Sequence, residues 1–126
     1  MLNKGLRDQE SIRIDNILKV LLSIVFVPKT LIEEDKINIE MQLKDLGLNI
    51  QSLIDFNTTD LIVHLQRCHL DWNQLEQFAD FLIKTSKENP FDFSEKAIAI
   101  YNYIQQESKT FSFEIFNKIA AVKANL

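Results

Sequence analysis

Apolar residues recur every three or four positions along most of the chain, which is the spacing of an amphipathic helix. Three segments in the second half, beginning near residues 72, 95 and 113, each gather their apolar residues on one side. These residues are Trp72, Leu75, Phe78, Ala79, Leu82 and Ile83 in the first segment, Ala97, Ile98, Ile100, Tyr101 and Ile104 in the second, and Ile115, Phe116, Ile119 and Val122 in the third. The whole chain has only two glycines and two prolines, too few for the turns of a many-stranded β fold. The pattern predicts an all-α protein.

Capping residues indicate where the later helices begin. Three times an apolar residue precedes Asp or Ser, and a second apolar residue follows four positions after that cap, which is the pattern of an N-cap with a hydrophobic staple. The three sets are Leu70, Asp71 and Leu75; Phe93, Ser94 and Ile98; and Phe111, Ser112 and Phe116.

The first half of the chain predicts four more helical segments. Pro28 should end a helix of about residues 11–27, because a proline disfavours the α region in the residue before it. Thr30 and Glu33 have the spacing of a capping box for a helix that runs to Leu46, with Gly47 as its left-handed terminator. Two short helices should follow between 50 and 67, separated at the sequence NTTD (57–60), with Thr58 or Thr59 as the cap of the second.

The links between these segments are short, which favours antiparallel neighbours. We therefore expect one domain over residues 1–126, with five or six helices in antiparallel hairpins and with residues 1–10 as a candidate flexible end. Within it, Ala97 and Tyr101 lie one helical turn apart. The small alanine would allow a neighbouring helix to approach closely, and the tyrosine ring would fill the space beside it with its hydroxyl in water.

Five stretches resemble a family of small bacterial proteins of unknown function with tetratricopeptide-like helical hairpins. They are LGL (46–48), DLIVHL (60–65), DWNQLEQFADFL (71–82), KAIAIYNYI (96–104) and FNKIAAV (116–122). The resemblance implies tetratricopeptide-like packing. It carries no catalytic residues to this chain, because the matching positions are mostly those of a core.

The net charge and the cysteine content indicate which kinds of partner and which cellular compartment are expected. The net charge of −4 argues against a nucleic-acid-binding protein, which needs clustered Lys and Arg. The one cysteine, Cys68, cannot form an internal disulfide, so a cytoplasmic location is expected. The longest apolar stretch, residues 17–27, contains Lys19 and is too short to span a membrane.

The residues most suited to metal binding or catalysis lie in the sequence HLQRCH (64–69). His64 and Cys68 are four residues apart, with His69 adjacent, and thiolate and imidazole are zinc ligands. A fourth ligand at a motif spacing is missing, so the simpler interpretation is a half-buried histidine and a small core cysteine. Glu76 and Asp80 are one turn apart and are expected on a solvated helix face with Lys84. We therefore predict no metal, no cofactor and no catalytic residues.

The segment 12–27 is apolar nearly all round. Either it is a central helix wrapped by the others, or its outer side associates with a second copy through Val20, Ile24 and Val27. Four phenylalanines near two predicted helix starts, Phe91, Phe93, Phe111 and Phe113, are either hydrophobic staples or the lining of a shallow apolar contact site.

These features favour a protein-interaction or scaffold module without catalytic activity, which acts on an unidentified protein partner and forms a homodimer. The alternative is a small helical enzyme or metal-binding regulator that uses His64, Cys68 and His69.

Overall fold

The computed structural model describes residues 2–27, 29–87 and 89–125, with side chains from residue 8 onward. The regular structure of this part of the chain is all-helical, as predicted. It has seven helices, which is the number of segments that the apolar and capping patterns indicate and more than the five or six expected for the domain. They are α1 (Leu2–Ile24), α2 (Glu33–Lys44), α3 (Ile50–Asp55), α4 (Thr58–Arg67), α5 (Trp72–Ser86), α6 (Ser94–Glu107) and α7 (Phe113–Ala124).

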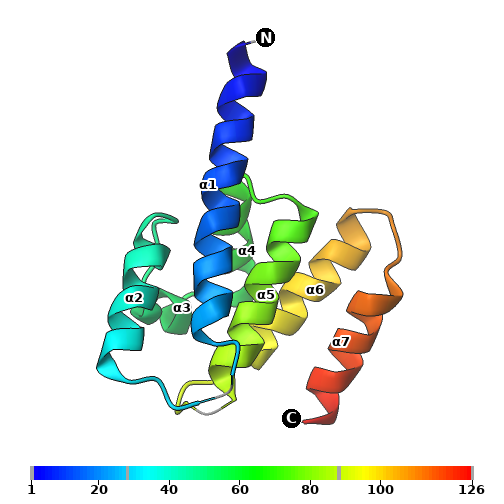
Figure 1. Ribbon diagram of the computed structural model, residues 1–126. Helices are drawn as coiled ribbons and strands as arrows, with labels where there is room; N and C mark the ends of the chain where they lie inside the picture. The colour runs from blue at the N-terminus through cyan, green and yellow to red at the C-terminus, as the bar shows by residue number, and fades with distance from the viewer. Residues whose placement is uncertain (1, 28, 88, 126) are drawn as a thin grey trace.

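Five of the helices lie side by side in the order α2, α1, α5, α6, α7, with α3 and α4 packed behind them (Figure 1). Consecutive helices α1 and α2, α5 and α6, and α6 and α7 run in opposite directions, as in antiparallel hairpins. The closest pairing is between α5 and α6.

The predicted N-caps of α5 and α7 are confirmed. The Asp71 carboxylate accepts from the Gln74 amide at 2.7 Å, and the Gln74 side chain accepts from the Asp71 amide at 2.9 Å, so the two residues form a capping box. The Ser112 hydroxyl accepts from the Ile115 amide at 3.2 Å. These bonds satisfy amides that have no partner within their own helix.

The predicted capping box at the start of α2 is wrong. Its helix begins at Glu33, so Glu33 lies in the first turn and not three residues into it. The carboxylate of Asp35 accepts from the Ile32 amide at 3.2 Å instead. Three acidic residues in this first turn favour the positive end of the helix dipole.

The first helix differs from its predicted limits at both ends. Its backbone is helical from Leu2, whereas the apolar pattern indicated a start near residue 11. It ends at Ile24, three residues before the predicted end. Pro28, which was predicted to end this helix, lies outside the described residues.

The first helix lies between α2 and α5, and this position buries most of its apolar residues. Those with almost no exposed surface are Ile14, Ile17, Leu18 and Leu21, and Val25, just after the helix, is equally buried. They join one core that includes residues of every other helix.

Ala97 and Tyr101 face the neighbouring helix α5. Ala97 is fully buried, which permits the close α5–α6 pairing. Tyr101 is only 2% exposed, and its hydroxyl donates to the Asp80 carboxylate of α5 at 2.6 Å. The expectation that this hydroxyl stays in water is therefore wrong, because a carboxylate from α5 takes the place of water.

Replacing Ala97 with leucine should lower the free energy of unfolding by about 1–3 kcal/mol, because the added methylenes would overpack the α5–α6 contact. Chemical denaturation should show a lower midpoint with an unchanged slope. Ala120→Leu is the matched control, since Ala120 is exposed on α7. Equal midpoints for the two variants would contradict a close crossing at Ala97.

Candidate functional site

His64 of α4 and Cys68, the residue after the end of α4, both point at the carbonyl group of Leu46, just beyond the end of α2. The His64 Nε2 atom lies 2.6 Å from the Leu46 oxygen, and a carbonyl only accepts, so this nitrogen carries the ring proton. The Cys68 thiol also donates to this oxygen, at 3.5 Å. The carbonyl groups at the end of a helix lack partners within it, so both side chains stabilise the end of α2.

Gly47 ends α2 as predicted, in the left-handed conformation with φ of 70°. Its amide donates to the Lys44 carbonyl, and the Leu48 amide donates to the Leu43 carbonyl, as in a Schellman motif. The His64 ring lies 3.4 Å from the position that a Cβ atom on Gly47 would occupy. The positive φ therefore favours glycine here, while a Cβ atom would just fit beside the His64 ring.

His69 does not join the other two candidate metal ligands. It is exposed and adopts a φ of 66° just after the end of α4. Burial raises the pKa of the Cys68 thiol, whereas metal binding requires the thiolate. Within the described residues, no three or more His, Cys, Asp and Glu side chains are grouped so as to hold a metal ion.

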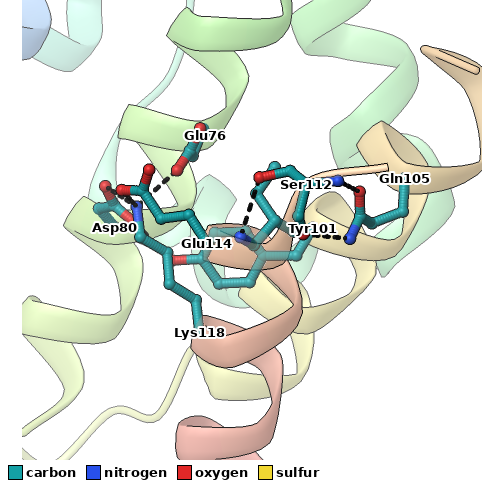
Figure 2. A network of polar contacts seen from close by, with 8 residues as sticks. Glu76, Asp80, Tyr101, Gln105, Ser112, Glu114 and Lys118 are labelled. Atoms are coloured by element: carbon teal, nitrogen blue, oxygen red, sulfur yellow. Dashed lines mark hydrogen bonds and ion pairs between the residues drawn. The ribbon is translucent and has the colours of Figure 1, made fainter. Parts of the chain in front are cut away.

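A polar network joins α5, α6 and α7 (Figure 2). The Lys118 ammonium of α7 donates to Glu76 at 2.6 Å and to Asp80 at 3.1 Å, both on α5. The second Asp80 oxygen accepts from the Tyr101 hydroxyl of α6 at 2.6 Å. Glu114, one turn before Lys118, forms a longer ion pair with it at 3.5 Å. The predicted solvated face that Glu76 and Asp80 would share with Lys84 is therefore wrong, because α7 partly covers both carboxylates.

The same network keeps its two proton donors protonated. Burial lowers the pKa of Lys118, but the hydrogen bonds to Glu76 and Asp80 outweigh this effect, and the pKa is raised. Burial and the hydrogen bond to the Asp80 carboxylate raise the pKa of Tyr101. Since an ammonium ion has no free lone pair, Lys118 is not a nucleophile at neutral pH. These groups act as donors that tie three helices together.

Sequence reasoning missed Lys118, although a signal for it was present. Lys118 lies three residues after Ile115 and one before Ile119, so it falls within the apolar side of α7. A lysine at such a position needs an acidic partner on the helix that this side contacts. Glu76 and Asp80, at i and i+4 on α5, supply that partner.

The four candidate contact phenylalanines fall into two separate pairs. Phe91 and Phe93 stack with ring centroids 5.0 Å apart in the link before α6, and Phe93 is only 2% exposed. Phe111 and Phe113 meet edge to face at 4.9 Å where α7 begins. The 14 residues of α6 lie between the pairs, a length of about 21 Å, so the four rings do not line one site.

The second pair belongs to a larger group of exposed rings. Phe116, one turn into α7, has its ring centroid 6.0 Å from that of Phe111. Phe111, Phe113 and Phe116 are 60%, 76% and 54% exposed, and we call them the phenylalanine cluster. The cluster lies on the outside of the last hairpin, where only Ile115 of α7 is buried in the core.

The candidate self-association residues Val20, Ile24 and Val27, here called the α1 strip, lie toward the end of α1 and just beyond it. Val20 is 37% exposed and Val27 is 63% exposed, whereas Ile24 is partly buried and packs against the core. The apolar surface left outside is therefore smaller than the sequence indicated, because α2 and α5 cover the rest of this helix.

Comparisons with models of known protein families, with characterised proteins and with solved structures found no match. Among the described helices, none combines the length and apolar character that crossing a membrane requires.

Proposed function

We propose that this chain is a protein-interaction or scaffold module without catalytic activity, which works in the cytoplasm and whose hairpins pack in a tetratricopeptide-like manner. The observation that carries the proposal is the phenylalanine cluster. Its three rings contact one another while each remains more than half exposed. Exposed groups of large apolar side chains on soluble domains are typical of interaction sites, and aromatic residues dominate the binding energy of such sites.

The chemistry of the remaining candidates supports the same proposal. His64 and Cys68 are engaged with a backbone carbonyl, and Lys118 is engaged with two carboxylates. Each of these side chains therefore has a structural partner that explains it. The exposed rings of the phenylalanine cluster have no such structural explanation, because removing them from water would require a surface outside this chain.

We further propose that the module forms a homodimer through the α1 strip. The two exposed valines lie at the ends of this strip, Val20 on α1 and Val27 just beyond it, and a two-fold interface needs only one self-complementary patch. The phenylalanine cluster is then left for the unidentified protein partner.

Light scattering of the purified protein at high micromolar concentration should give the mass of a dimer. Val20→Glu combined with Val27→Glu should give the mass of a monomer, because unpaired charges would be buried in the interface. Circular dichroism should show unchanged helicity, since both valines lie outside the core. Phe111→Ser combined with Phe113→Ser is the matched control and should leave the dimer intact.

A wild-type monomer under these conditions would contradict self-association. If only the phenylalanine variant dissociates the dimer, the interface lies on α7, and the proposed role of the α1 strip is wrong.

A further inference from the structure

A cleft of about 580 Å³ lies where the first half of α1, the link from α4 to α5, and α6 meet. This volume is within the usual range for sites that bind small groups. Neither the phenylalanine cluster nor the α1 strip contributes to its lining, so it is a separate feature of the surface.

One side of the cleft is aromatic. Trp72, the first residue of α5, and Tyr103 of α6 have ring centroids 5.8 Å apart and planes inclined at 47°. The side-chain amide of Gln66 donates to the Tyr103 hydroxyl, which fixes that ring. Trp72 remains 42% exposed, so indole surface is accessible to a ligand.

The charged side chains that line the cleft are all acidic. They are Asp8 and Glu10 of α1 and Asp71 at the start of α5. The imidazole of His69 also lines the cleft, and no Lys or Arg is among the described lining residues. Arg13, one turn beyond Glu10, donates to the Asp45 carbonyl at 3.0 Å and is held by the end of α2. The aromatic side and the three carboxylates therefore present a surface that attracts positive charge.

A buried side chain fixes the floor of the cleft. Gln74 is 1% exposed, and its carbonyl accepts from the Asp71 amide. Its amide group donates to the Ser11 hydroxyl at 3.1 Å and to the Asp15 carboxylate at 2.9 Å. These bonds hold α1 against α5, so both sides of the cleft are in place before a ligand arrives, which lowers the entropic cost of binding.

We propose that this cleft binds the guanidinium group of an arginine side chain from a partner protein. A guanidinium ion is planar, stacks on aromatic faces and forms hydrogen bonds with carboxylates, so it suits a cleft whose lining combines Trp72 with Asp8 and Glu10. That the arginine belongs to a protein rests on the proposed function, whereas the preference for a cation follows from the cleft alone.

The test uses the fluorescence of Trp72, which is the one tryptophan of the chain and so reports on the cleft directly. The probe is a short blocked peptide with a central arginine, and the matched peptide carries citrulline, which has nearly the same shape without the charge. The arginine peptide should change the fluorescence saturably, and added salt should weaken the response. The citrulline peptide should produce no saturable change.

Asp8→Asn combined with Glu10→Gln should weaken binding of the arginine peptide about tenfold, since two charge-assisted contacts are lost. Tyr103→Leu should weaken it by a similar factor through loss of the aromatic side. Glu95→Gln is the matched control, because this carboxylate is exposed on α6 outside the cleft, and its binding should equal that of the wild type.

Equal binding of the citrulline peptide would overturn the proposal, and so would an unchanged affinity in the Asp8 and Glu10 variant. If free arginine amide binds as tightly as the peptide, the claim that the arginine belongs to a partner protein would be wrong. The result does not depend on self-association, because light scattering of the same sample reports the dimer separately.

Discussion

Replacing Phe78 with alanine should lower the free energy of unfolding by about 3–5 kcal/mol. Phe78 is fully buried on α5, and its ring centroid lies 5.9 Å from that of Phe81. Truncation removes its apolar contacts and leaves a cavity that the close-packed helices can fill only in part. Denaturant unfolding monitored by circular dichroism measures the change.

Phe113→Ala is the control for this prediction, because it removes the same atoms from a ring that is 76% exposed. It should change the free energy of unfolding by at most about 0.5 kcal/mol. If the two variants lose equal stability, the phenylalanine cluster is part of the folded core, and the proposed interaction surface is wrong.

The second large effect is a loss of stability at alkaline pH. The pKa of Tyr101 is raised in the folded protein by burial and by Asp80, so its phenol ionises first in the unfolded chain, near the ordinary pKa of about 10. The stabilisation is fully present below that pH. It should fall by up to about 1.4 kcal/mol for each pH unit above it, until the phenol of the folded protein also ionises.

Tyr101→Phe should make unfolding less steeply dependent on pH above 10, while its stability at neutral pH is lower because Asp80 loses a donor. Tyr103→Phe is the matched control and should keep the wild-type pH dependence. Urea midpoints between pH 8 and pH 11.5 measure both variants. Parallel curves for the wild type and Tyr101→Phe would show that the tyrosine does not contribute to the alkaline loss.

The helices of the second half were the more predictable part of the fold, because the residues that cap them lie close to their partners in the sequence. Asp71 and Ser112 cap their helices through residues three positions away, so the sequence contains both partners. At the start of α4 the predicted cap was wrong. Thr58 or Thr59 was predicted, but Asn57 caps this helix through the Asp60 amide.

The start of α6 shows a second limit of local patterns. Ser94 was predicted as its cap, but Ser94 is the first residue of the helix, and its amide donates to the Asp92 carboxylate at 2.9 Å. The Phe93 amide in turn donates to the Ser86 hydroxyl of α5. The preceding helix thus helps to set where α6 begins, and a short sequence pattern contains no information about that contact.

The candidate site was less predictable, because its residues are far apart in sequence. Lys118 meets Glu76 and Asp80 across about forty positions, and the cleft combines residues of α1, α5 and α6. Apart from the position of Lys118 on the apolar side of α7, nothing within a single helix indicates these contacts. Only the side-by-side order of the helices brings the residues together.

The place of α1 between α2 and α5 also has a consequence for how the chain is made. During synthesis α1 leaves the ribosome before α5, which covers one of its sides and begins some fifty residues after α1 ends. The α5–α6 hairpin joins neighbours in sequence, so it closes a short loop and can form early, whereas docking of α1 must close a long one. Until then the nascent chain exposes Leu18, Leu21 and Val25 to chaperones and to other nascent chains.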